Sequence, residues 1–250
     1  MTSDKVLYSN NDHLLVLLNI SEPGEENGIP SNQYLILNKG KGILIDPGGF
    51  GVMPQVLHHL MKYLEPKDLV GIVLSHQDPD IVGSLSSWME MTEAKIYVSK
   101  IWLRFLPHYG IKDMHRFDGI DDNGGELILN DIVLKFLPAH FLHSPGQLNV
   151  YDPISKILFT SDIGAAEYQG EDFSEIFVDD FSKHQSHIEY FHRRYMSSNR
   201  ALRYWLKTIK PYDIEIIAPQ HGYLYKDEAK VGLLRWLETL KCGSDLLNID

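Results

Sequence analysis

The chain alternates apolar runs of strand length with segments whose apolar residues recur at helical spacing. Such runs, bounded by Gly, Pro and Asn, are typical of buried strands, and the helical patterns are typical of helices packed on a sheet. In the first half, we expect strands at residues 13–20, 33–38, 42–46, 68–75 and 95–99, with helices at 52–64 and 81–91. In the second half, we expect strands at 126–129, 132–137, 148–151, 156–160 and 214–218, with helices at 172–210 (broken near 197–199) and 227–240.

Two strand-rich halves with outer helices predict an α/β fold in which two sheets pack face to face between helices, an αββα sandwich. The chain has 250 residues, which is long enough for one large core. No linker, low-complexity tract or short repeat interrupts it. We therefore expect a single domain over residues 1–250.

Charge and cysteine content narrow the classes of partner and site. The formal net charge of −11 repels phosphates and anionic lipid, so we expect no nucleic-acid partner and no membrane insertion. The start of the chain lacks a basic-then-apolar signal pattern, and no apolar run is long enough to span a bilayer. Cys242 is the only cysteine, which excludes an internal disulfide and fits a reducing cytoplasm. The chain has 12 histidines, so a metal here would be held by imidazole and carboxylate, which suits iron, zinc or manganese.

The strongest local signal is the segment His76-Gln-Asp-Pro-Asp80, which directly follows an apolar strand. Alternate residues of an extended segment point the same way, so His76, Asp78 and Asp80 can converge on one point. A side chain at a strand end is held rigidly from below and is open to a cleft above. The alternative is a helix cap with ordinary turn residues.

Three further residues stand where later strands end: His143, Asp162 and His221. Taken singly, each histidine has a structural alternative as a hydrogen-bonded strand-end residue, and Asp162 has one as a turn residue. Their joint order along the chain favours a shared site.

In that order, the motifs resemble those of the metallo-β-lactamase superfamily. They are the HxDxD segment 76–80, His-Ser-Pro-Gly at 143–146, Leu-Phe-Thr-Ser-Asp at 158–162 and Ala-Pro-Gln-His-Gly at 218–222. The resemblance runs from about residue 14 to residue 240 and implies the four-layer αββα fold. It also implies that Asp46 supports the metal ligands without binding metal.

Within that superfamily, hydrolases carry HxHxDH and bind two zinc ions, whereas flavodiiron proteins carry HxExDH. Here the third position is Asp78, and a carboxylate in place of imidazole favours iron. The resemblance then implies that His76, Asp78 and His143 hold one metal, that Asp80 and His221 hold the other, and that Asp162 bridges them.

Two departures from the flavodiiron pattern point to a smaller group. The family has a histidine directly after the second aspartate, where this chain has Ile81, and the chain has no room for the flavodoxin-like domain that carries FMN. Both features are similar to those of stand-alone oxygen-binding diiron proteins. We therefore expect an open gas-binding position beside Ile81, and we name no catalytic residue.

The function implied is binding of O2, or NO, at two iron ions bridged by an oxo, hydroxo or peroxo group, without FMN in this chain. The protein would act as an oxygen sensor or as the catalytic half of an oxygen or NO reductase. The resemblance implies a homodimer, and either a separate electron donor or a chemotaxis signalling partner. The alternative is a dinuclear zinc hydrolase acting on a thioester, lactone or phosphoester.

The sequence says less about the roles of the other histidines. His140 stands three residues before His143 and is a candidate to support the site from behind, although a structural role is the simpler interpretation. His184, His187 and His192 do not share one helical face well, so their spacing indicates surface or dimer contacts.

Overall fold

Two sheets form the centre of the fold, in a computed structural model that describes residues 4–18, 30–166 and 175–248. In the first sheet the strands follow chain order, antiparallel from β1 to β4 and parallel from β4 to β7. Its strands are β1 (Lys5–Asn10), β2 (His13–Leu18), β3 (Gln33–Asn38), β4 (Lys41–Ile45), β5 (Leu69–Val73), β6 (Lys95–Ser99) and β7 (Phe117–Ile120).

The second sheet has the order β13-β12-β11-β10-β9-β8, and only β11 and β12 are parallel neighbours. Its strands are β8 (Gly125–Leu129), β9 (Ile132–Pro138), β10 (Leu148–Asp152), β11 (Ile157–Ser161), β12 (Ile216–Pro219) and β13 (Tyr225–Lys226).

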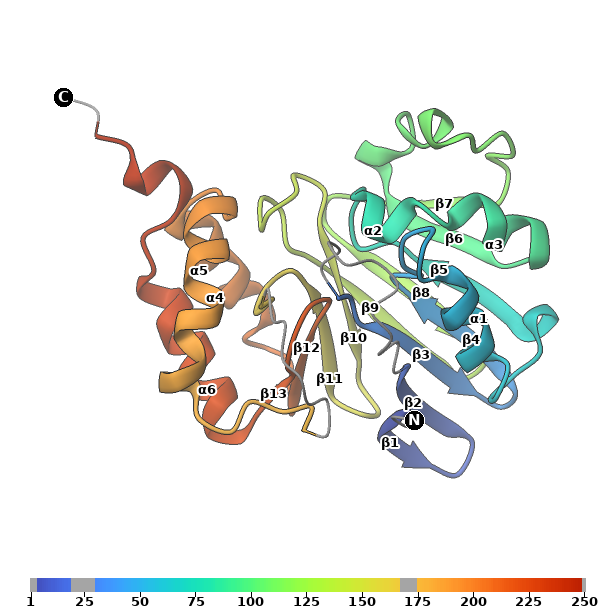
Figure 1. Ribbon diagram of the computed structural model, residues 1–250, viewed down its shortest axis with the longest axis horizontal. Coiled ribbons are helices and arrows are strands. Elements are labelled where there is room, and N and C mark those ends of the chain that lie inside the picture. Colours follow the sequence, from blue (N-terminus) through green and yellow to red (C-terminus); the bar gives the residue numbers. More distant parts are fainter. Residues whose placement is uncertain (1–3, 19–29, 167–174, 249–250) are drawn as a thin grey trace.

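The two sheets pack face to face and share a buried core between them (Figure 1). Tyr34 of β3 and Phe159 of β11 meet there, with ring centroids 4.9 Å apart. A buried pair also joins the sheets, because Nε2 of His13 on β2 lies 2.8 Å from Oδ2 of Asp152 on β10. The inner faces of both sheets therefore form one continuous interior.

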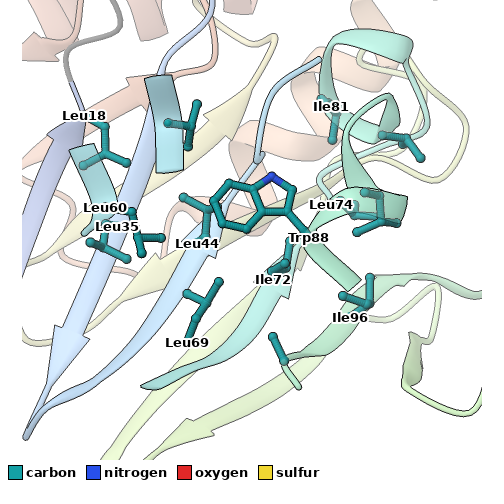
Figure 2. Packing of buried hydrophobic residues seen from close by; sticks show 14 of the residues in the cluster. Leu18, Leu35, Leu44, Leu60, Leu69, Ile72, Leu74, Ile81, Trp88 and Ile96 are labelled. Atoms are coloured by element: carbon teal, nitrogen blue, oxygen red, sulfur yellow. The ribbon is translucent and has the colours of Figure 1, made fainter. Parts of the chain in front are cut away.

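Helices cover the outer face of each sheet, which completes four layers (Figure 1). On the first sheet, α1 (Met53–Leu60) and α3 (Leu85–Met91) bury Leu60 and Trp88 against its apolar residues (Figure 2). On the second sheet lie α4 (Phe181–Tyr195), α5 (Asn199–Ile209) and α6 (Asp227–Thr239). The predicted αββα sandwich is confirmed.

Most predicted elements are present, with differences at edges and breaks. Strands β1, β7 and β13 were not predicted, because β1 is largely exposed, β7 contains Asp118 and Gly119, and β13 has only two residues. The predicted break near residues 197–199 is confirmed, since α4 ends before it and α5 begins at Asn199. The expectations for residues 19–20 and 172–174 lie outside the described residues. Among the described residues, no helix is long and apolar enough to cross a membrane.

The helix predicted at 81–91 differs in two respects, since the helical segment begins earlier and is interrupted. A short helix α2 (Pro79–Val82) precedes α3, and Gly83 and Ser84 separate them. The loop after β4 packs closely at this point, because a Cβ atom on Gly83 would lie 3.5 Å from Cα of Gly49. The Ser84 hydroxyl also donates to the carbonyl of Gly48 at 2.5 Å. This contact fixes α2, and with it Asp80, against the end of β4.

Candidate metal centre

All six residues proposed as metal ligands lie just beyond the ends of strands. His76 follows β5, Asp78 occupies the N-cap position of α2 without a side-chain capping hydrogen bond, and Asp80 lies in the first turn of α2. His143 lies in the loop from β9 to β10, Asp162 directly follows β11, and His221 follows β12. The parallel neighbours β11 and β12 end at the same sheet edge, so Asp162 and His221 are placed together by topology.

Four donor atoms form the first group. Nε2 of His76 lies 3.5 Å from Oδ2 of Asp78 and 3.3 Å from Oδ2 of Asp162. Nε2 of His143 lies 3.3 Å and 3.4 Å from the same two oxygens. Each aspartate thus directs one carboxylate oxygen toward both imidazoles. His76, Asp78 and His143 alone already form a cluster with ligand atoms within 4.8 Å of one another.

The second group uses the other oxygen of Asp162. Nε2 of His221 lies 3.2 Å from Oδ2 of Asp80 and 3.7 Å from Oδ1 of Asp162. Oδ2 of Asp162 faces the first group, so its two oxygens are divided between the groups. A carboxylate in this arrangement is suited to bridge two metal ions.

The separations fit bound metal. Donor atoms held by bonds of about 2.1 Å to one ion stand roughly 3.0–3.4 Å apart in octahedral or tetrahedral geometry. The distances of 3.3–3.5 Å in the first group agree with this spacing. Imidazole and carboxylate donors suit iron, zinc and manganese. The residues present therefore fit a dinuclear metal centre.

Buried hydrogen bonds turn Nε2 of two imidazoles toward the site. Nδ1 of His76 lies 3.1 Å from the Ser75 hydroxyl and 3.0 Å from the Ser161 hydroxyl. Both hydroxyls use their protons elsewhere, since Ser75 donates to Ser161 and Ser161 donates to Asp162. Nδ1 of His76 is therefore the donor. Nδ1 of His221 likewise donates to the carbonyl of Pro30 at 2.8 Å, because a carbonyl can only accept.

Glutamines hold two of the carboxylates. Nε2 of Gln77 donates to Oδ1 of Asp78 at 2.8 Å, and the Ser144 hydroxyl donates to Oε1 of Gln77 at 2.7 Å. Nε2 of Gln220 donates to Oδ2 of Asp80 at 3.0 Å. Neither glutamine was predicted from the sequence. Each stands beside a motif histidine, which is the one local signal that marks them.

Without metal, the imidazoles and carboxylates stabilise one another's charged forms. Burial alone would lower the pKa of His76, but the carboxylates of Asp162 and Asp78 raise it to about 9. Burial would raise the pKa of Asp78, but hydrogen bonds from His143 and His76 hold it well below its ordinary value. The same opposition raises the pKa of His221 and lowers that of Asp80. The site therefore favours positive charge at its centre, which a metal cation supplies.

Asp46 lies behind the site, beside the strand that leads to His76. Its Oδ1 accepts a hydrogen bond from the backbone N–H of Ser75 at 2.8 Å. Burial raises its pKa to about 6, against the lowering effect of that hydrogen bond and of His76. This placement agrees with a supporting role, which remains a proposal.

His140 faces another way. Its Nε2 lies 2.7 Å from the carbonyl of Asp122, which ties the loop after β9 to the turn before β8. This contact fits the structural interpretation.

Ile81 is fully buried and belongs to the apolar cluster of α1, α3 and the first sheet (Figure 2). Its side chain therefore packs into this core.

Aromatic side chains of α4 pack against His143. Its ring packs edge-on against Phe191 and Tyr195, at centroid distances of 6.1 Å and 5.9 Å, and those two rings stack at 4.8 Å. Tyr109 donates to the carbonyl of Gln77 at 2.8 Å. Burial and the carboxylates of Asp78 and Asp80 raise the pKa of Tyr109. These rings lie beside the first group of donors.

The expectation of surface contacts is wrong for His184 and His192, which are both buried. Nε2 of His192 accepts a hydrogen bond from the backbone N–H of Gly164 at 2.9 Å. The Tyr225 hydroxyl donates to the carbonyl of Gly164 at 2.7 Å, and His184 lies 3.0 Å from that hydroxyl. Helix α4 thus fixes the turn that follows Asp162. No periodicity in the sequence could reveal this, because the partner is a backbone group on another element.

His192 provides a testable pH dependence of stability. Burial lowers its pKa to about 4, whereas an unfolded histidine has a pKa of about 6.5. Its contribution to stability is complete above about pH 6.5 and is lost as the pH falls toward 4, because the unfolded chain takes up the proton first. At pH 5 the loss is roughly 2 kcal/mol.

Urea unfolding of wild-type protein and of His192→Gln at pH 7 and pH 5 checks this. Between pH 7 and pH 5, we expect the free energy of unfolding of His192→Gln to fall by roughly 2 kcal/mol less than that of the wild-type protein. Equal losses in both proteins would contradict the burial of a neutral imidazole. His115→Gln, at a position outside the core, serves as the control.

The family model and the solved structures that match this chain agree with one another. A family model described as ODP family beta lactamase matches residues 29–222. The structure described as "Apo state of chemotaxis sensor ODP from T. denticola" is 41% identical, with a TM-score of 0.89, and the match covers 98% of this chain and 97% of that chain. The structure described as "Peroxy diiron species of chemotaxis sensor ODP" is 39% identical, with a TM-score of 0.86, and the match covers 96% of this chain and 97% of that chain.

Curated relatives are longer. The uncharacterized protein MJ0732 of Methanocaldococcus jannaschii is 30% identical over 206 residues, which are 82% of this chain and 51% of that protein. The flavo-diiron protein FprA2 of Clostridium acetobutylicum is 26% identical over 199 residues, which are 79% of this chain and 50% of that protein. The chain thus spans about half the length of these relatives.

Proposed function

Because the chain belongs to the ODP family of β-lactamase-fold proteins, we propose that it holds two iron ions and binds O2 as a sensor. The proposal rests mainly on Asp162, because one of its carboxylate oxygens faces the first group of donors and the other faces the second. His76, Asp78 and His143 would hold one ion, and Asp80 and His221 the other. The similarity to a diiron chemotaxis sensor supports iron in place of zinc.

The chain's own residues account for how such a centre would work. When bound, the ferrous ions supply the electrons that O2 takes up. Asp162 fixes the spacing of the two positions, and the Ser75, Ser161 and Pro30 contacts keep two imidazoles oriented with Nε2 forward. The second group offers three protein donors, Asp80, Asp162 and His221, and so leaves room for an exogenous ligand. Phe191 and Tyr195 would shield one side of His143 from water.

Several finer points belong to the same proposal. The chain would act as one domain in the cytoplasm, as a homodimer, with a chemotaxis signalling protein as its partner. A separate electron donor would be needed for repeated turnover. NO is an alternative ligand for the same position. Asp46 would support the ligands from behind.

Metal content and the visible spectrum of anaerobically reduced protein, before and after air, test the proposal. We expect about two irons per chain and a new oxygen-dependent charge-transfer absorption. Zinc-loaded protein is the matched control and should show no such change. Two zinc ions in the protein as isolated, with no oxygen-dependent spectrum, would favour a hydrolase.

Oxygen consumption with a chemical reductant separates sensor from enzyme. A sensor should take up O2 once per centre and then stop. Rapid catalytic consumption would contradict a purely sensory role.

A further inference from the structure

A groove on the outer surface of the second helical layer gathers positive charge. It has a volume of about 680 Å³ and is lined mainly by residues of α5. Four of its lining residues are basic: Arg200, Arg203, Lys207 and Lys210. All four are exposed, which is notable in a chain with a net charge of −11.

The four cations form a stripe. They are spaced by three, four and three residues, so they follow one face of α5 into its C-terminal cap. Ten residues of helix span about 15 Å. The helix sequence NRALRYWLKTI contains no acidic residue to offset them.

The stripe also lacks acidic partners among the residues that the structure describes. None of the four cations forms an ion pair or side-chain hydrogen bond with another residue in the part of the chain that the structure describes. Most other lysines of the surface are paired, as Lys156 is with Asp213 and Glu215. Neighbouring like charges on a helix repel one another, so the stripe is unfavourable unless an anion binds there.

We propose that this groove docks an acidic segment of a partner protein. Carboxylates spaced along about 15 Å, as on one face of a short helix, would pair with the stripe. The ring of Tyr204 is 63% exposed within the groove and offers an apolar contact beside the charges. The proposal does not rest on the metal chemistry.

The rest of the groove and of the molecule argues against a nucleic acid. Glu238 and Asp245 also line the groove, and they would repel a continuous phosphate backbone while accepting a basic residue of a peptide. The net charge of −11 adds a general repulsion of polyphosphates. A protein segment of mixed but mainly acidic character fits both walls.

Fluorescence anisotropy with labelled peptides tests the docking. The probe is a Glu-rich peptide of about twelve residues, long enough to span the stripe as a helix, and its matched control replaces every Glu by Gln. We expect saturable binding of the Glu peptide that weakens as salt rises. Arg203→Glu combined with Lys207→Glu should reduce the affinity at least ~10-fold.

A variant with the same change of charge elsewhere provides the control. Lys95→Glu combined with Lys112→Glu lies outside the groove and should alter the affinity by less than ~3-fold. Circular dichroism confirms that both variants are folded.

Three results would overturn the proposal. Absence of binding to the Glu peptide would make the stripe a solvated helix face. Tighter binding of a single-stranded DNA of similar length would assign the groove to nucleic acid. Loss of a dimer on charge reversal at Arg203 and Lys207, seen by sedimentation, would assign the groove to a second copy of this chain.

Discussion

Replacement of Asp162 by alanine is expected to abolish binding of both iron ions. Each oxygen of this buried carboxylate faces a different donor group, so its loss removes one donor from each proposed ion and the link between them. Loss of a partner that orients metal ligands lowers affinity by about 10–100-fold, and loss of a bridging ligand should exceed that. Iron content after anaerobic loading and desalting measures the effect.

Variants that remove a donor from only one of the two groups show whether the loss of both irons is specific to Asp162. Asp78→Ala and Asp80→Ala each remove a donor from one group only, so each should retain about one iron per chain. Near-ultraviolet circular dichroism, which reports the buried Trp88 and Trp205, checks that the metal-free variants are folded. Retention of two irons by folded Asp162→Ala would contradict the bridge.

The second large effect is expected for Ile81→His, which places the imidazole of the flavodiiron pattern at this position. Ile81 is fully buried in the apolar cluster that contains Leu74 and Trp88 (Figure 2). An imidazole there loses apolar packing and hydrogen bonds to water, so the metal-free protein should be less stable by roughly 2–4 kcal/mol. Urea unfolding without metal measures this cost.

Iron then tests whether the imidazole reaches the second group. If it becomes a ligand, ferrous iron should stabilise Ile81→His more than wild type, because binding contributes only to the folded state. The oxygen-dependent absorption should also decay faster, since the exogenous ligand would lose its position. Ile81→Leu is the control and should cost less than about 1.5 kcal/mol. Equal stabilisation by iron and equal decay in all three proteins would contradict an open position beside Ile81.

The family and its metal chemistry were predictable from the sequence because the signals are local. A histidine or aspartate directly after an apolar strand is visible in the chain itself, as in His76 and Asp162. The order of these residues and the presence of a carboxylate at Asp78 can be read from the sequence alone. The same holds for the αββα layers, since strand and helix periodicity follow from neighbours in the sequence.

The wrong predictions concern contacts between segments that are distant in the sequence. His192 is buried because α4 packs on the turn at Gly164, and nothing within α4 indicates which of its faces meets that turn. The interruption of the helix at Gly83 depends on a loop more than thirty residues earlier in the chain. Both errors concern contacts between elements, where residue spacing carries no information.

The sequence by itself therefore determined which side chains are available as ligands, their order, and the elements that carry them. Only the tertiary structure decided how these ligands are divided between the two groups of donors. The packing of the two sheets places the oxygens of Asp162 between two groups of donors. The packing of helices on the first sheet buries Ile81, and among the described residues the cations of α5 have no acidic partner. The physical reason is that ligand type is a property of a residue, whereas distance and burial are set by segments that meet only when the chain folds.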